Sequence, residues 1–281
     1  MHLPTKVSTD EAHGGCCDGG VTGTKPRALW VYAHPDRTSF NQQLFAAGRS
    51  ALAKTHEVVI TDLYAASFDP VLSQRDLGSQ ADVDDTFLNR WAAAYNEGHL
   101  PDEIRAEQQK LMDADLIVLQ FPLWWYSLPA ILKGWIDRVF TSGFGFDLPL
   151  GPDRLPRRYG GGLLAGKRAL VVVSAGETAR ALGPRGLGGD IDTLMFGLTH
   201  GVLWYTGVAT YPLHVIADAD DLDSDAVQRE ITRLTSRIGE LGGEDVIPYR
   251  RLDSGDYRPG RVLRDGLAPG RVDLGLHLST T

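Results

Sequence analysis

Cysteine is nearly absent from this 281-residue sequence, because its only two cysteines, Cys16 and Cys17, are neighbours in the chain. Adjacent cysteines form a poor disulfide, so nothing in the sequence indicates an oxidising compartment. Apolar runs are also short. None approaches the roughly 18 residues of a membrane-spanning helix, and none follows a positively charged start. We therefore expect no membrane span, no signal peptide and a cytoplasmic location.

An excess of positive charge is lacking as well. The sequence has 36 acidic against 28 basic residues, a formal net charge of −8 and a pI of about 5.5. A basic patch or domain is the electrostatic footprint of a protein that binds nucleic acid. We therefore expect no nucleic-acid partner. The length allows one large or two small domains.

The beginning of the chain, residues 1–26, is polar and glycine-rich. Such a segment has too little apolar surface to build a core, so we interpret it as a disordered leader. His13, Cys16 and Cys17 fall within it, but their spacing has no second half of a metal-binding motif. The sequence therefore predicts no metal site.

The most informative stretch lies near the middle of the chain. Leu116–Phe121 is a continuous apolar run, too short for a helix and typical of a strand buried on both faces. Pro122 ends this run, and apolar residues recur with helical period after Pro129. The loop between them carries three adjacent rings: Trp124, Trp125 and Tyr126. They suit a platform for a planar cofactor, although packing in the core is the alternative.

Four other apolar runs are predicted strands: Ala28–Ala33, Glu57–Leu63, Arg168–Ser174 and Ala209–Val215. Helical patterns alternate with them at Asn41–Lys54, Phe87–Tyr95, Asp102–Met112, Ile191–Thr206 and Ser224–Leu241, the last capped by Ser224. The alternation predicts an α/β fold: a flavodoxin-like, doubly wound parallel five-stranded sheet with helices on both faces. We expect this domain to span residues 27–242. An irregular tail, residues 243–281, then either packs on a neighbouring subunit or stays mobile.

Ligands of such sheets bind beyond the carboxyl ends of the strands, where three loops should meet. The first loop ends in polar residues at a helix start, and the helix dipole there favours phosphate. Plain capping of the helix is the alternative for Thr38 and Ser39. The second loop carries the three rings, and the third is the glycine-rich run 174–189. Together they indicate a flavin site.

Four segments resemble the NAD(P)H:quinone oxidoreductases of the DT-diaphorase type. They are AHPDRTSFN at Ala33–Asn41, VVITDLYAASFDPVLS from Val58, YNEGHL from Tyr95, and ADLIVLQFPLWWYSLPAILKGWIDRVF from Ala114. The resemblance implies a homodimer with its active site at the interface. It also implies bound FAD and ping-pong transfer of hydride from NAD(P)H, through flavin N5, to a quinone or similar flat aromatic acceptor. FMN stays open, because the family's adenine-contacting arginine falls near Val227.

Residue by residue, the resemblance implies cofactor contacts in the three loops. They are His34, Thr38, Ser39, Phe40 and Asn41, then Pro122, Leu123, Trp124, Trp125, Tyr126 and Ser127, and finally Ser174, Ala175, Gly176 and Glu177. Trp125 and Tyr126 should border the substrate pocket. Phe146 and Leu148 fall where the family has two pocket tyrosines.

The sequence departs from the family at the positions of a tyrosine and a histidine near the flavin. Leu182 and Gly188 occupy them, and neither donates a side-chain hydrogen bond, so no catalytic residue is assigned. Backbone amides could stabilise the reduced flavin instead, as could Arg180 or Arg185, unless both arginines are simply solvated. Two alternatives follow: a specialised enzyme for an aromatic metabolite, azo or nitro acceptor, and a flavin-binding sensor without turnover.

Overall fold

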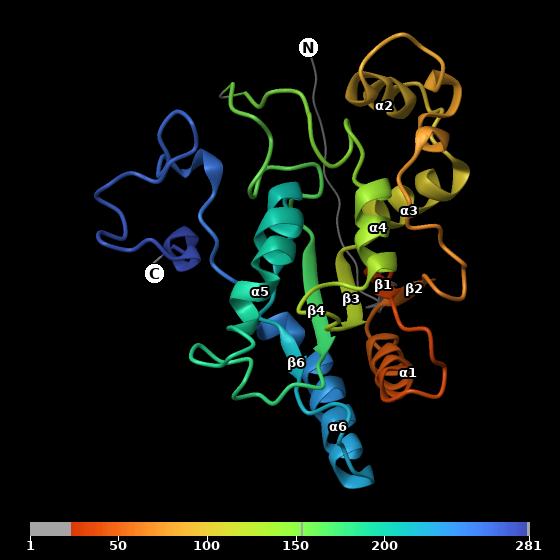
Figure 1. The fold of residues 1–281 in the computed structure, drawn as a ribbon, viewed down its shortest axis with the longest axis vertical. Helices are drawn as coiled ribbons and strands as arrows, with labels where there is room; N and C mark the ends of the chain where they lie inside the picture. The colour runs from red at the N-terminus through yellow and green to blue at the C-terminus, as the bar shows by residue number, and fades with distance from the viewer. Residues whose placement is uncertain (1–23, 153, 280–281) are drawn as a thin grey trace, which may run out of the picture.

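A parallel β-sheet forms the centre of the protein (Figure 1). The computed structural model describes residues 24–152 and 154–279, so His13, Cys16, Cys17 and most of the predicted leader lie outside the described residues. The strands are β1 (Arg27–Tyr32), β2 (Glu57–Asp62), β3 (Leu116–Pro122), β4 (Arg168–Ser174), β5 (Ala209–Thr210) and β6 (His214–Ile216). Their order is β2-β1-β3-β4-β5, and β6 also pairs with β4.

Helices cover both faces of this sheet, as predicted. They are α1 (Phe40–Leu52), α2 (Phe87–Asn96), α3 (Asp102–Asp113), α4 (Ala130–Val139), α5 (Ile191–Leu198) and α6 (Ser224–Glu240). Short helical turns are η1 (Gln74–Gln80), η2 (Thr199–Trp204), η3 (Leu241–Gly243), η4 (Leu252–Ser254) and η5 (Leu274–His277). One core cluster packs α1 and α6 on the sheet, and the other packs α2 to α5 on the opposite face. The flavodoxin-like prediction is confirmed.

Alternating side chains of the strands divide between these two cores, because successive residues of a strand point to opposite faces. Leu29 and Val31 of β1 join the core under α3 and α4, whereas Trp30 joins the core under α1. Gly48 of α1 makes room for that indole, since a Cβ there would lie 2.5 Å from Trp30 Cη2. All seven residues of β3 are buried, as a central parallel strand requires.

Three details differ from the sequence-based expectation. The predicted strand Ala209–Val215 is interrupted: β5 and β6 both pair with β4, and Pro212 between them has no N–H to donate. The helix predicted to reach Thr206 changes after Leu198 into the π-helical turn η2. Asp223 rather than Ser224 caps α6, since its carboxylate accepts a hydrogen bond from Ala226 N–H at 2.7 Å.

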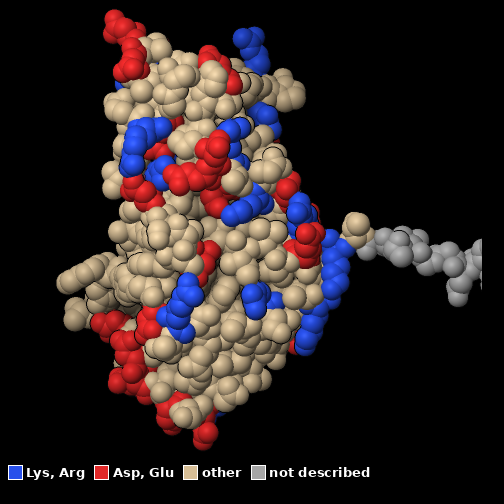
Figure 2. Space-filling model, turned by 90° about the vertical axis from the view of Figure 1, so that its right-hand side faces the viewer, with Lys and Arg blue, Asp and Glu red and all other residues tan. Residues whose placement is uncertain are grey.

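The C-terminal tail folds back on its own chain. Ile247 N–H donates to the Thr210 carbonyl at 2.8 Å, and Trp204 Nε1–H of η2 donates to the Arg250 carbonyl at 3.0 Å. The tail therefore lies beside α5 and η2, as Figure 1 shows in blue and teal. Among the described residues, no helix is long and apolar enough to cross a bilayer. Figure 2 shows acidic side chains low on one face and basic side chains along another edge, without a wide basic surface.

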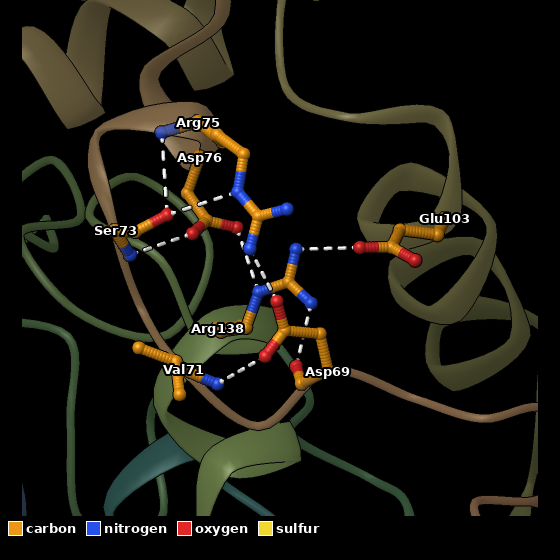
Figure 3. Close-up of polar contacts among 7 residues, drawn as sticks. All are labelled: Asp69, Val71, Ser73, Arg75, Asp76, Glu103 and Arg138. Carbon is orange, nitrogen blue, oxygen red and sulfur yellow. Dashed lines mark hydrogen bonds and ion pairs between the residues drawn. The ribbon is translucent and has the colours of Figure 1, made fainter.

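A buried ion pair fixes α4, the helix that begins just after the three rings (Figure 3). Arg138 Nε donates to Asp76 Oδ1 at 2.8 Å, and the side chains are only 4% and 1% exposed. The same guanidinium donates to the Asp69 carbonyl at 2.7 Å and to Glu103 Oε1 at 2.5 Å. Ser73 N–H donates to the other Asp76 oxygen at 2.8 Å. Helix α4 is thereby tied to α3 and to the connection after β2.

Candidate active site

Loops from four strands enclose a cavity of about 360 Å³ at the carboxyl edge of the sheet. It is lined by His34, Ser39, Phe40, Asn41, Pro122, Leu123, Trp124, Ser174, Ala175, Gly176, Ala219 and Asp220. Ten of these were predicted from the sequence, whereas Thr38, Trp125, Tyr126, Ser127 and Glu177 do not line it. The loop after β6, with Ala219 and Asp220, was missed. Its position after a parallel strand was the signal that could have found it.

The first loop is held by its own side chains. Asp36 Oδ1 accepts hydrogen bonds from the backbone N–H and the hydroxyl of Thr38, both at 2.7 Å. These bonds lower the pKa of the Asp36 carboxyl. Ser39 caps α1 by accepting from Gln42 N–H at 3.2 Å. The capping interpretation is therefore right for Ser39, and the Thr38 hydroxyl is committed to Asp36.

Hydrogen-bond donors without a partner lie beside Thr38 and Ser39. The backbone N–H groups of Phe40 and Asn41, at the start of α1, make no hydrogen bond within the described chain. His34 Nδ1 lies 3.1 Å from Asp36 N and 3.2 Å from the Asp36 carbonyl oxygen, whereas Nε2 has no partner among the described residues. In the tautomer that accepts from Asp36 N–H, the neutral ring carries its proton on Nε2. Two amides, one imidazole N–H and the helix dipole together suit a phosphate group.

Asn41 and Ser174 are brought together although 133 positions separate them. Asn41 Nδ2 donates to Ser174 Oγ at 2.9 Å, and the Ser174 hydroxyl lies 3.1 Å from Asn41 Oδ1. Both side chains are buried, and Gln120 Nε2 donates to the Asn41 carbonyl at 2.8 Å. These side chains fix the start of α1 to β3 and β4 and so position the open amides.

The three rings lie in a tight turn that projects from the sheet. Trp124 and Ser127 exchange two backbone hydrogen bonds, of 3.1 and 3.0 Å. Trp125 and Tyr126 between them have φ of 50° and 58°, a conformation that such turns usually give to asparagine or glycine. The cost is about 1–2 kcal/mol for each residue. Trp125 is 96% exposed, so the alternative that the rings belong to the core is wrong.

Tyr126 links this turn to the glycine-rich loop. Its hydroxyl donates to Glu177 Oε1 at 3.0 Å, and this hydrogen bond raises the pKa of the tyrosine. A Cβ at Gly188 would lie 2.9 Å from Tyr126 Cε1, so the phenol ring occupies the space of a side chain at that position. Leu182 is buried inside the loop. Gly188 thus leaves room for the ring of Tyr126.

The remaining predicted residues lie elsewhere. Phe146 packs edge-on against Trp91, with centroids 5.9 Å apart, and lines a different cavity beside Tyr205. Leu148 follows it in the same loop, and neither lines the 360 Å³ cavity of its own chain. Arg180 and Arg185 are exposed in the glycine-rich loop, and neither lines that cavity either.

Comparison with known proteins agrees with this fold. A family model described as flavodoxin-like fold matches residues 26–238. A ribosyldihydronicotinamide dehydrogenase-like protein of Penicillium crustosum is 35% identical, covering 90% of this chain and 96% of the relative. Human ribosyldihydronicotinamide dehydrogenase [quinone] is 32% identical, covering 79% and 94%. A Klebsiella pneumoniae structure assigned as a quinone reductase superimposes with a TM-score of 0.87, at 37% identity, covering 91% and 100%.

Proposed function

This chain belongs to the flavodoxin-like fold family, and on that premise we propose that it is a flavin-dependent NAD(P)H oxidoreductase reducing quinones or similar flat aromatic acceptors. The observation that carries the proposal is one juxtaposition. An exposed aromatic turn stands beside a cavity whose far wall offers unpaired amides at the start of α1. The relatives named as quinone-linked dehydrogenases support the same activity.

The residues present fit a flavin. The amides of Phe40 and Asn41, with His34 Nε2–H, would hold its phosphate, and Trp124 with Gly176 would flank its ring system. When bound, the flavin accepts hydride from NAD(P)H and passes it to the acceptor. The protein's part is to orient both flat substrates, and Trp125 offers a ring face for stacking. We propose FAD as the flavin, with FMN as the alternative.

We further propose that the protein is a homodimer with its active site at the interface. Trp125 is too exposed to border a closed pocket within one chain. Phe146 and Leu148 lie away from the cavity of their own chain, and we propose that their loop borders that of a partner. Sedimentation equilibrium tests this assembly. A monomer at micromolar concentration with full activity would contradict it.

The activity is tested on the purified protein without added cofactor. We expect a yellow protein whose flavin absorbance bleaches under NADPH in the absence of oxygen and returns on addition of menadione. Mass spectrometry of the released cofactor distinguishes FAD from FMN. A bound flavin that NADPH does not bleach would refute the proposal. Slow NADPH oxidation with every acceptor would instead favour the alternative of a flavin-binding sensor without turnover.

A second candidate keeps the flavin and narrows the acceptor. The observation that favours it is the Tyr126–Glu177 hydrogen bond, which places a carboxylate at the rim of the site. A carboxylate there favours acceptors that carry a hydrogen-bond donor or a positive charge. Profiling quinones, azo and nitro compounds with wild type and Glu177→Gln separates the two. A profile unchanged by the substitution would rule out this role for Glu177.

A further inference from the structure

A second cavity lies between the C-terminal tail and the helical segment formed by α5 and η2. We call it the tail pocket, and its volume is about 410 Å³. Its main lining side chains come from three parts of the chain: Tyr159, Phe196, His200, Tyr257, Arg261 and His277. None of them lines the cavity at the carboxyl edge of the sheet. The pocket therefore needs an account of its own.

Stacked rings form one wall of the tail pocket. His200 lies at the centre of this wall, with Phe196 at 4.5 Å and 18° between ring planes, and Tyr159 at 4.9 Å and 29°. His277 of the tail stacks on His200 at 5.4 Å and 26°. Rings from the body and the tail thus give the pocket an aromatic wall against which a planar ligand can pack.

This wall carries no charge at neutral pH. Burial, together with the neighbouring His277, lowers the pKa of His200 to about 4. Burial and Arg250 also lower the pKa of His277. The Tyr257 hydroxyl shares a hydrogen bond of 3.0 Å with His277 Nδ1, and burial raises the pKa of that tyrosine.

Arg261 supplies the single charge of the pocket. The other arginines of the tail are committed: Arg250 to Asp256, Arg251 to Asp253, Arg258 to Asp265, Arg271 to Asp273, and Arg264 to the Gly255 carbonyl. Within the described part of the chain, the Arg261 guanidinium has no hydrogen bond or ion pair. Its φ of 64° follows the φ of 84° at Gly260, so a strained hairpin tip holds it at the pocket.

We propose that the tail pocket binds an aromatic carboxylate, with its ring against the stacked wall and its carboxylate on the Arg261 guanidinium. The planar fork of arginine matches the two oxygens of a carboxylate, which gives the pairing geometric specificity. An uncharged aromatic compound would leave the guanidinium unpaired. A non-aromatic acid would leave the stacked wall uncovered. This inference is independent of the proposed oxidoreductase activity.

The test is calorimetric titration of the full-length holoprotein at pH 7.5 with 2-naphthoate and its neutral counterpart naphthalene-2-carboxamide. Arg261 is exposed to solvent, and exposed ion pairs contribute about 0.2–1 kcal/mol, so we expect Arg261→Ala to weaken naphthoate binding about 2- to 5-fold. Carboxamide binding should change little. Arg261→Lys, which keeps the charge and loses the fork, should fall between.

Arg258→Ala is the matched control, because Arg258 lies in the same hairpin and is paired with Asp265. It should bind naphthoate as wild type does. Trp125→Ala tests whether the ligand sits at the aromatic turn instead. The proposal is overturned if naphthoate does not bind, if wild type binds the acid no more tightly than the amide, or if Trp125→Ala rather than Arg261→Ala removes binding.

Discussion

Replacing Arg138 by alanine should destabilise the protein more than any exposed charge deletion. The Arg138 and Asp76 side chains are 4% and 1% exposed, so neither has water to replace a lost partner. Without the guanidinium, Asp76 keeps only the hydrogen bond from Ser73 N–H. Removing one member of a buried ion pair costs about 3–5 kcal/mol, because a buried charge is left uncompensated.

Two comparison variants separate burial from charge. Lys133→Ala removes an ion pair with Asp137 on the same helix, but those side chains are 56% and 44% exposed. It should cost less than about 1 kcal/mol. Asp76→Asn removes the buried charge while an oxygen still accepts from Arg138, whose bond to Glu103 remains. It should cost about 1–3 kcal/mol.

The assay is equilibrium unfolding in urea, followed by circular dichroism at one fixed protein concentration, since an associating protein unfolds in a concentration-dependent way. Shifts of the midpoint at constant slope give the differences in unfolding free energy. If Arg138→Ala costs no more than Lys133→Ala, the ion pair does not secure α4. The aromatic turn would then be held by packing alone.

Three further outcomes are expected. Trp125→Gly should raise the unfolding free energy by about 1 kcal/mol, because glycine adopts the left-handed conformation without strain. The same substitution should lower kcat/KM for menadione, and a kcat/KM equal to that of wild type would refute the stacking role of Trp125. Gly188→Ala should weaken flavin binding in a fluorescence titration, because the added Cβ would lie 2.9 Å from Tyr126 Cε1. Adding Tyr126→Ala should restore binding, and a double variant that binds as weakly as Gly188→Ala would contradict this account. Burial lowers the pKa of His214 from 6.5 to about 3, and neither ring nitrogen has a hydrogen-bond partner among the residues that the structure describes. The unfolded chain therefore binds the proton first, and stability falls with pH below 6.5, by about 3 kcal/mol at pH 4.5. His214→Leu should remove that slope, whereas parallel curves would contradict the assignment.

The strands could be predicted from the sequence because a strand that is buried on both faces is a continuous apolar run. Leu116–Phe121 was predicted, and β3 is Leu116–Pro122. The interruption of the last strand was readable too, since Pro212 lies inside the predicted run and cannot donate to the ladder. The apolar character of the run favours one continuous strand, but the missing N–H group of Pro212 interrupts it.

The location of the site could be predicted from the sequence, but its internal hydrogen bonds could not. The rule that ligands bind beyond parallel strands located all three predicted loops at one cavity. No spacing shows that Thr38 bonds Asp36 or that Asn41 bonds Ser174, because these depend on side-chain orientation and on contacts across the sheet. The tail pocket was beyond prediction for the same reason, since His200 and His277 meet only through the folding back of the tail.

The departures from the resembling family are connected by a single contact. The Tyr126 ring fills the space beside position 188, so any side chain there must displace it. Its hydroxyl needs an acceptor, and Glu177 supplies one. Leu182 is buried in the same loop, and its Cδ2 lies 3.4 Å from where a Cβ at Gly188 would stand. Gly188, Tyr126 and Glu177 are therefore linked by contact, and a histidine at position 188 would have to displace the Tyr126 ring.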